Sequence, residues 1–232
     1  MAQNQSGDRA DIRIEGPVAG HHCKAIPSLT QDGGAKVHTL EIMTSSTESR
    51  EDAMFHKAVL IETDSTDKET RMLLSRLEVG YGGYGNATHV SLRGRLVNTR
   101  EDGLIVKAES ITEKRQKVNS ARAEISGVIE KILPYRSGYT ATLSVENPYG
   151  MDKKMSVSFL LGKKENPDTV KKIAEGKISE GDTLLVTGNL LSQTMGDGNR
   201  KFNFCSVRAE SVKVLKKAQK QTERTRVGKQ TI

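Results

Sequence analysis

Flat aromatic side chains and cations are combined in the second half of the sequence, and this combination suits the bases and phosphates of an unpaired nucleic acid strand. Rings provide faces on which bases stack, and Lys and Arg neutralise the phosphates. Of the 5 Tyr and 4 Phe, most lie after residue 120. The candidate contact residues are Tyr135, Arg136, Tyr139, Lys153, Lys154, Arg200, Lys201, Phe202 and Phe204.

The position of a ring in the sequence predicts whether it binds the ligand or packs in the core, and this prediction is clearer for some rings than for others. Tyr135 and Tyr139 fall in a short turn between two expected strands, where large rings have no core to fill. Phe202 and Phe204 are two residues apart and so share one strand face. That face either points to solvent beside the basic hairpin tip or faces the core. Phe159 lies in an apolar run and is expected in the core.

The chain ends in a basic segment. Residues 213–232 hold seven Lys and Arg and one acid, with few large apolar side chains. This composition predicts a flexible tail from residue 216 onward, either disordered or a frayed helix. The tail either keeps the protein in solution or adds phosphate contacts that make binding more dependent on salt. On the second interpretation Lys216, Lys217 and Lys220 join the candidate residues.

A glycine-rich loop in the first half presents two further rings. Residues 80–85 fit the G-x-G-x-x-G pattern of dinucleotide sites. Such sites follow a strand and open a helix, whereas this loop follows an expected helix and precedes an expected strand. We therefore expect no bound cofactor here and keep Tyr81 and Tyr84 as weaker candidates for base stacking.

Residues with catalytic or metal-binding chemistry are present but do not form a pattern. His21, His22, Cys23 and His38 offer nitrogen and sulfur ligands, yet their spacing matches no metal motif, and we expect solvated loop histidines. The acids between residues 64 and 69 fall at an expected helix start, where capping and the helix dipole account for them. We find no set of nucleophile, base and orienting group, and so expect no enzyme, no metal and no cofactor.

Composition and charge exclude further classes of protein. The 232 residues contain no apolar run near the roughly 20 residues that a membrane-spanning helix needs. The N-terminus lacks a signal-peptide profile, and two cysteines make no disulfide framework, so we expect a cytoplasmic protein without membrane contact. The net charge of +7 is uneven. Residues 1–112 hold 13 Lys and Arg against 16 Asp and Glu, whereas residues 113–212 hold 16 against 12.

The sequence contains an internal duplication of about 100 residues. Six short matches occur in the same order in both halves, which indicates a repeat rather than chance. The matched segments are residues 14–16 with 125–127, 39–42 with 142–145, 55–61 with 155–161, 90–96 with 184–190, 102–103 with 197–198, and 108–111 with 209–212.

Each copy predicts the element order βββαββ, because three segments of period-2 hydrophobicity precede an amphipathic helix and two more strands. This is the order of the OB fold, a partly open five-stranded Greek-key barrel; an unrelated α+β domain with the same order is the alternative. Gly16, Gly94, Gly127 and Gly188 fall where the strands must bend.

We therefore expect an all-β chain of two tandem OB-fold-like barrels. The expected divisions are a disordered N-terminus over residues 1–10, a first barrel over 11–112, a charged linker over 113–120, a second barrel over 121–215, and the basic tail over 216–232.

Residues 184–215 resemble the last hairpin of bacterial single-stranded-DNA-binding proteins. They combine an apolar strand with Gly188, a long ribbon tip with an Asp-Gly turn and basic residues, and a strand that ends in an Ala-x-x-Val pattern. The resemblance implies a replication, recombination or repair accessory that coats single strands without sequence preference. Two features depart from that family. The chain has no Trp for base stacking, and a basic tail replaces the family's acidic, partner-recruiting C-terminal peptide.

The sequence thus predicts a protein that binds single-stranded DNA, mainly through the second barrel and the tail. An RNA-binding module and a structural or assembly protein that uses its barrels for protein contacts are the alternatives. The net acidic first barrel is expected to contact a protein, either a second copy of the chain or a replication protein.

Overall fold

The computed structural model describes residues 8–26, 35–45, 53–80, 86–116, 118–147, 152–196 and 202–218. Strands dominate this part of the chain, with one short helix in each half. The elements are β1 (Arg9–Ile26), β2 (Ala35–Ser45), β3 (Ala53–Glu62), α1 (Lys68–Ser75), β4 (His89–Thr99), β5 (Gly103–Glu113), β6 (Ser120–Tyr135), β7 (Gly138–Glu146), β8 (Lys154–Leu161), α2 (Pro167–Ala174), β9 (Thr183–Met195) and β10 (Phe202–Lys216).

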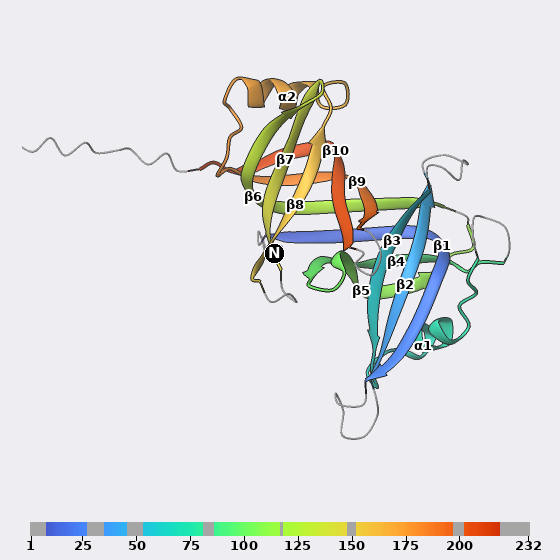
Figure 1. Ribbon diagram of the computed structural model, residues 1–232. Coiled ribbons are helices and arrows are strands. Elements are labelled where there is room, and N and C mark those ends of the chain that lie inside the picture. The colour runs from blue at the N-terminus through green and yellow to red at the C-terminus, as the bar shows by residue number, and fades with distance from the viewer. Residues whose placement is uncertain are drawn as a thin grey trace, which may run out of the picture.

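The strands pair in two closed rings of five. In the first ring β1 pairs with β2 and β4, β2 pairs with β3, and β5 closes the ring against β3 and β4. The second ring, β6 to β10, repeats these pairings in the same order. We call the rings the first and second barrel (Figure 1). The all-β class and the βββαββ order of each half are confirmed, whereas the domain boundaries stay a prediction.

The two barrels share one sheet. The first half of β1 pairs with β4 on one side and with β6 on the other, and β6 in turn pairs with β9. β1 and β6 therefore run side by side through the middle of the molecule (Figure 1). A single bridge between Asn203 and Gly103 adds a second connection, from β10 to β5. Glu113 ends β5 and Ser120 begins β6, so residues 114–119 join the two strands.

Alternating apolar residues fill each barrel. Ile12, Ile14, Leu40 and Leu92 are buried in the first barrel, and residues with the same strand periodicity fill the second. Phe159 is 2% exposed, so its predicted place in the core is confirmed. No helix in the described ranges is long and apolar enough to cross a membrane.

The four expected bend glycines lie where a strand passes directly over the backbone of its neighbour. A Cβ at Gly16 would collide with the carbonyl oxygen of Met43, and β1 changes partner from β4 to β2 at this point. A Cβ at Gly188 would collide with the carbonyl oxygen of Arg208. Gly94 and Gly127 are equally crowded by backbone. These positions need glycine because a side chain has no space, which agrees with their predicted role in barrel closure.

Candidate nucleic-acid interface

The outer face of the second barrel is continuous across β6, β7, β8 and β10. Side chains directly opposite one another in a sheet point to the same face, so the register defines two rows across these four strands. One row runs Leu133, Thr140, Leu160, Arg208, and the next runs Lys131, Thr142, Ser158, Ser206. We call this surface, extended by Tyr135 on β6, by Ser144 and Ser156 on β7 and β8 and by Phe204 on β10, the second-barrel face.

Small hydroxyl side chains form the middle of the second-barrel face. Residues of β7 and β8 alternate between the core and this face, where the outward side chains are mostly half-buried Ser and Thr, and Glu146 and Lys154 are exposed at the strand ends. Ser156 donates a hydrogen bond to Glu130 Oε2 at 2.8 Å. None of the described residues in this central region is aromatic, so rings stand only at the edges of the face.

Tyr135 stands at one corner of the second-barrel face, at the end of β6. Its side chain is 44% exposed, and the guanidinium carbon of Arg136 lies 5.2 Å from the ring centroid. Arg136 has a φ of 49°, the only positive φ among the described non-glycine residues. The tight turn therefore turns the arginine back over the ring, and this pair presents a flat surface and a cation together.

Tyr139 does not share this position. It pairs with Pro134 across the hairpin and is half-buried against the hydrophobic core. Tyr135 pairs instead with Gly138, so the two rings lie on opposite faces of the ribbon. The expectation that neither ring of this turn has a core to fill is wrong for Tyr139, because the core extends to the end of the β6–β7 ribbon.

Phe202 and Phe204 point to solvent. Their side chains are 44% and 47% exposed, while Cys205 and Val207 from the opposite side of β10 are buried in the core. Met195 lies opposite Phe202, and Gln193 lies opposite Phe204. This settles which way the pair faces: the outward alternative is correct. Phe204 occupies the corner of the second-barrel face diagonal to Tyr135.

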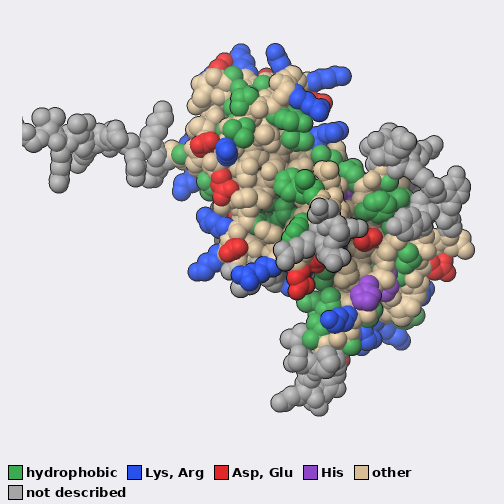
Figure 2. Space-filling model, viewed as in Figure 1, with side chains coloured by type: hydrophobic (Ala, Val, Ile, Leu, Met, Phe, Trp, Pro, Cys, Tyr) green, Lys and Arg blue, Asp and Glu red, His purple; other side chains and the backbone are tan. Residues whose placement is uncertain are grey.

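The predicted lysines fall into two groups. Lys153 and Lys154 are exposed at the start of β8, and Lys216 is exposed at the end of β10. Lys217 is instead held on the second barrel, where its Nζ lies 2.8 Å from Asp182 Oδ2 and also donates to the carbonyl of Lys177. The flexible tail predicted from residue 216 is therefore wrong for its first three residues, since a buried carboxylate fixes them. Figure 2 shows Lys and Arg side chains around the lobe that carries α2 and β7.

Asp182 is an anchor for the end of β10. Its side chain is 2% exposed. Burial acts to raise its pKa, but the hydrogen bonds from Lys217 and from the backbone N–H groups of Ala218 and Ser179 outweigh burial, so the pKa is lowered. The carboxylate therefore stays charged and keeps Lys217 engaged.

Five of the predicted contact residues lie outside the described residues. They are Tyr81, Tyr84, Arg200, Lys201 and Lys220.

A groove between the barrels was missed at the level of sequence. It has a volume of about 620 Å³ and lies between the ends of β2 and β3 on one side and the outer face of β9 and β10 on the other. Phe204, Ser206 and Arg208 belong both to this groove and to the second-barrel face. No local sequence signal could have revealed it, because its walls come from opposite halves of the chain. We call it the inter-barrel groove.

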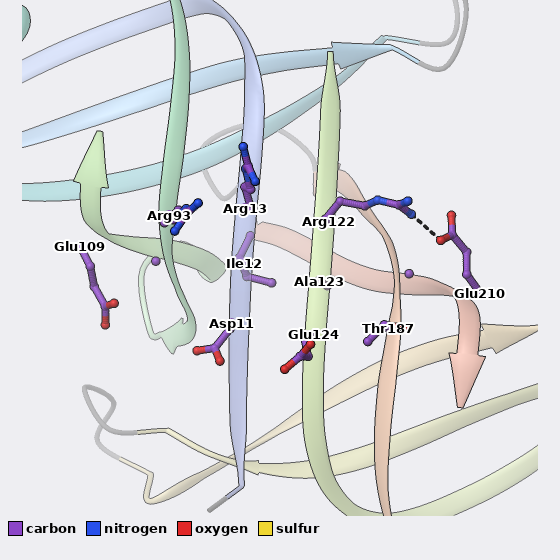
Figure 3. Close-up of a pocket in the computed structure, with 12 residues that line it drawn as sticks. Asp11, Ile12, Arg13, Arg93, Glu109, Arg122, Ala123, Glu124, Thr187 and Glu210 are labelled. Carbon is purple, nitrogen blue, oxygen red and sulfur yellow. Dashed lines mark ion pairs between the residues drawn. The ribbon is translucent and has the colours of Figure 1, made fainter. Parts of the chain in front are cut away.

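A second hollow, of about 560 Å³, lies on the sheet that the barrels share. Arg93, Arg13 and Arg122 form one row across three neighbouring strands, and Asp11 lies beside Glu124 in a second row, as Figure 3 shows. Arg122 lies 2.5 Å from Glu210, and Arg13 lies 2.7 Å from Glu15. Asp11, Glu109, Glu124 and Glu210 offset Arg13, Arg93 and Arg122 here. This surface is therefore less suited to a polyanion than the second-barrel face.

The predicted solvated loop histidines lie on strands β1 and β2 instead: His22 is exposed as expected, but His21 is half-buried and His38 is buried. His38 is 4% exposed, stacks on His21, and lies 2.9 Å from Glu62 Oε2 and 3.0 Å from the His21 ring nitrogen. Burial, together with the charges of His38 and His22, lowers the pKa of His21. Within the described ranges, no three His, Cys, Asp or Glu residues form a group that could hold a metal ion.

Comparisons with known proteins identify the fold. No family model matches the sequence, and no curated protein matches it either. The structure is similar to that of wild-type single-stranded DNA binding protein from Thermus aquaticus, with 16% identity and a TM-score of 0.59 over 95% of this chain and 100% of the other. A deletion mutant of the Thermus protein gives 15% identity and a TM-score of 0.61 over 94% of this chain and 100% of the other. Together with the strand order, this likeness shows that the chain has the OB fold.

Proposed function

We propose that the protein binds single-stranded DNA without strong sequence preference, and that it does so mainly through the second-barrel face and the basic tail. The observation that carries this proposal is the placement of exposed Tyr135 and Phe204 at opposite corners of one continuous surface. Base stacking needs such open rings, and each stacked base contributes about 1–3 kcal/mol. Two solved structures to which the fold is similar, those of the Thermus aquaticus protein, are of a single-stranded DNA binding protein, which supports this choice of ligand.

Cations accompany the rings along the proposed path. Arg136 lies over Tyr135 at one corner, and Arg208 stands two residues from Ser206 at the other edge. Lys131 lies in the row of Ser206, next to the row of Arg208, and Lys154 opens β8. Contacts to rings and phosphates read no base edges, so binding that tolerates any sequence is expected.

Titration of labelled oligonucleotides at two ionic strengths tests the proposal. A single strand should bind more tightly than a duplex of the same length, and its affinity should fall with salt. An RNA strand of equal length, used as competitor, distinguishes a DNA-binding role from an RNA-binding role. Equal affinity for single strands and duplexes, or no measurable binding, would reject the proposal.

The biological setting is a further part of the proposal. A protein of this kind serves as an accessory in replication, recombination or repair, and we place it in the cytoplasm. The first barrel then serves contacts with a second copy of the chain or with a replication protein. Co-purification of partner proteins with the full chain, with and without nuclease, tests that assignment.

A further inference from the structure

The inter-barrel groove has walls of different character. The second-barrel wall is formed by the outer side chains of β9 and β10, and the opposite wall by Thr44, Ala53 and Met54 at the ends of β2 and β3. Residues 119–121, where the chain enters the second barrel, line it between these walls. The groove is therefore assembled only when both barrels are present in one chain.

The second-barrel wall carries the groups that recognise a nucleotide. Phe204 offers an open ring, and Gln193 lies directly opposite it in the ribbon with an amide that can both donate and accept. Arg208 is the only charged residue among the described residues that line the groove, and it makes no ion pair within the described part of the chain. Its guanidinium is thus available to a phosphate.

The described residues of the first-barrel wall, Thr44, Ala53 and Met54, carry no charge. Thr44 Oγ1 lies 2.8 Å from His56 Nε2, so the hydroxyl is engaged behind the wall. Burial lowers the pKa of His56 to about 4, which keeps this ring neutral at physiological pH. Met54, which pairs with Thr44, supplies a flexible apolar side chain that can pack against a base. No acidic residue is among the described residues that line the groove, so none of these side chains repels a phosphate.

We propose that a segment of the bound DNA strand enters the inter-barrel groove, so that the first barrel contributes one wall of the binding site. This inference rests on the proposed function. The groove continues the second-barrel face through Leu160, Ser206 and Arg208, so a strand that crosses that face from Tyr135 reaches the groove without leaving the surface. The net acidic first barrel is then a partner in DNA binding rather than a scaffold alone.

Opposite charges placed on Met54 test the inference. Met54→Glu should weaken binding of a single-stranded oligo-dT about fivefold and Met54→Lys should tighten it about fivefold, because a phosphate passes this wall. The slope of log affinity against log salt should steepen by about 0.7 for Met54→Lys, the value for one added cation on a single strand. A general loss of folding would move both variants in the same direction.

Met72 provides the matched control. It is 52% exposed on α1, in the same barrel and away from the groove. Met72→Glu and Met72→Lys should each leave the affinity within about twofold of the wild-type value, since no phosphate passes there. If the Met54 pair shifts no more than the Met72 pair, or if both Met54 variants weaken binding alike, the inference is overturned while the proposed function stands.

Photo-crosslinking gives an independent readout on the unmodified protein. An oligo-dT that contains 5-iodouracil should crosslink to the peptide with Met54 and to the peptide with Phe204. Crosslinks confined to the second barrel would overturn the inference. If the wild-type protein binds no single strand at all, the proposed function fails and the inference fails with it.

Discussion

Ile12 lies directly opposite Ala123 where β1 pairs with β6, and the two residues occupy the same position in the two sequence repeats. β1 and β6 run antiparallel, so the residue that precedes Ile12 in β1 lies opposite the residue that follows Ala123 in β6, and the reverse holds on the other side of the pair. Asp11, for example, lies opposite Glu124, whereas Arg13 lies opposite Arg122. The duplicated sequence thus pairs with itself, and the two barrels share backbone hydrogen bonds as well as side-chain contacts.

Because β4, β1, β6 and β9 form one sheet, we expect the barrels to unfold together. Loss of either barrel would leave the paired edge of β1 or β6 without hydrogen-bond partners. Differential scanning calorimetry should show one transition with equal calorimetric and van't Hoff enthalpies. Two separated transitions would show that the shared sheet does not couple the barrels.

Gly188→Ala should destabilise the protein by about 3 kcal/mol, because the new methyl group collides with the backbone of β10. Gly176 is the matched control. It has a φ of +68° with no atom within 4 Å of a built Cβ, so Gly176→Ala should cost about 1 kcal/mol from the backbone conformation alone. Urea denaturation of both variants measures the difference, and equal losses would contradict the steric explanation.

The fold was predictable because strand periodicity and the repeat are local properties of the sequence. The spacing of apolar residues in each copy indicates five strands and a helix, and Gly16 and Gly188 lie where the barrel requires a residue without a side chain. The outward orientation of Phe204 was not predictable, because both faces of the β10 sequence carry apolar residues. The core selects Cys205 and Val207, which leaves the phenylalanines outside.

The parts of the site that were missed depend on contacts between distant segments. The sequence alone predicts that Lys217 belongs to the flexible tail, but Asp182, 35 positions earlier, holds it on the second barrel. The sequence alone predicts an exposed turn position for Tyr139, but its ring packs against the hydrophobic core. The inter-barrel groove needs the pairing of β1 with β6, which no periodicity within either repeat indicates.

Tyr135 and Tyr139 should respond differently to substitution. Tyr135→Ala should weaken oligo-dT binding about tenfold, the equivalent of one stacked base, and leave the melting temperature nearly unchanged because the ring is 44% exposed. Tyr139→Ala should lower the melting temperature, because its ring packs on the core. Fluorescence titration and thermal denaturation of both variants provide the comparison. A stable Tyr139→Ala variant with weakened binding would show that its ring faces the ligand after all.

His56 should make stability depend on pH. Burial lowers its pKa from 6.5 to about 4, and its Nδ1 has no hydrogen-bond partner among the described residues. Between these two values the unfolded chain binds the proton and the folded chain does not, so the stabilisation is complete above pH 6.5 and is lost as the pH falls toward 4.

The loss from this one residue should be about 2 kcal/mol between pH 7 and pH 5. His56→Gln should therefore flatten the dependence of unfolding free energy on pH relative to the wild-type protein. His21, whose pKa is also lowered, contributes with the same sign in both proteins. If His56→Gln shows the same loss as the wild-type protein, the buried ring is not its source.

Lys217 and the segment after it should separate stability from binding. Lys217→Ala leaves buried Asp182 without its ion pair and should destabilise the protein by about 1–3 kcal/mol. It should leave the salt dependence of DNA affinity unchanged, because this lysine is already neutralised by Asp182.

Truncation after Ala218 removes Lys220, Arg224, Arg226 and Lys229. It should flatten the slope of log affinity against log salt by up to about 3, at about 0.7 for each phosphate that the tail no longer neutralises. The folded state should keep its stability, because every hydrogen bond of Asp182 remains. An unchanged slope would place the removed cations away from the strand, and the rings and cations of the second barrel would then account for binding alone.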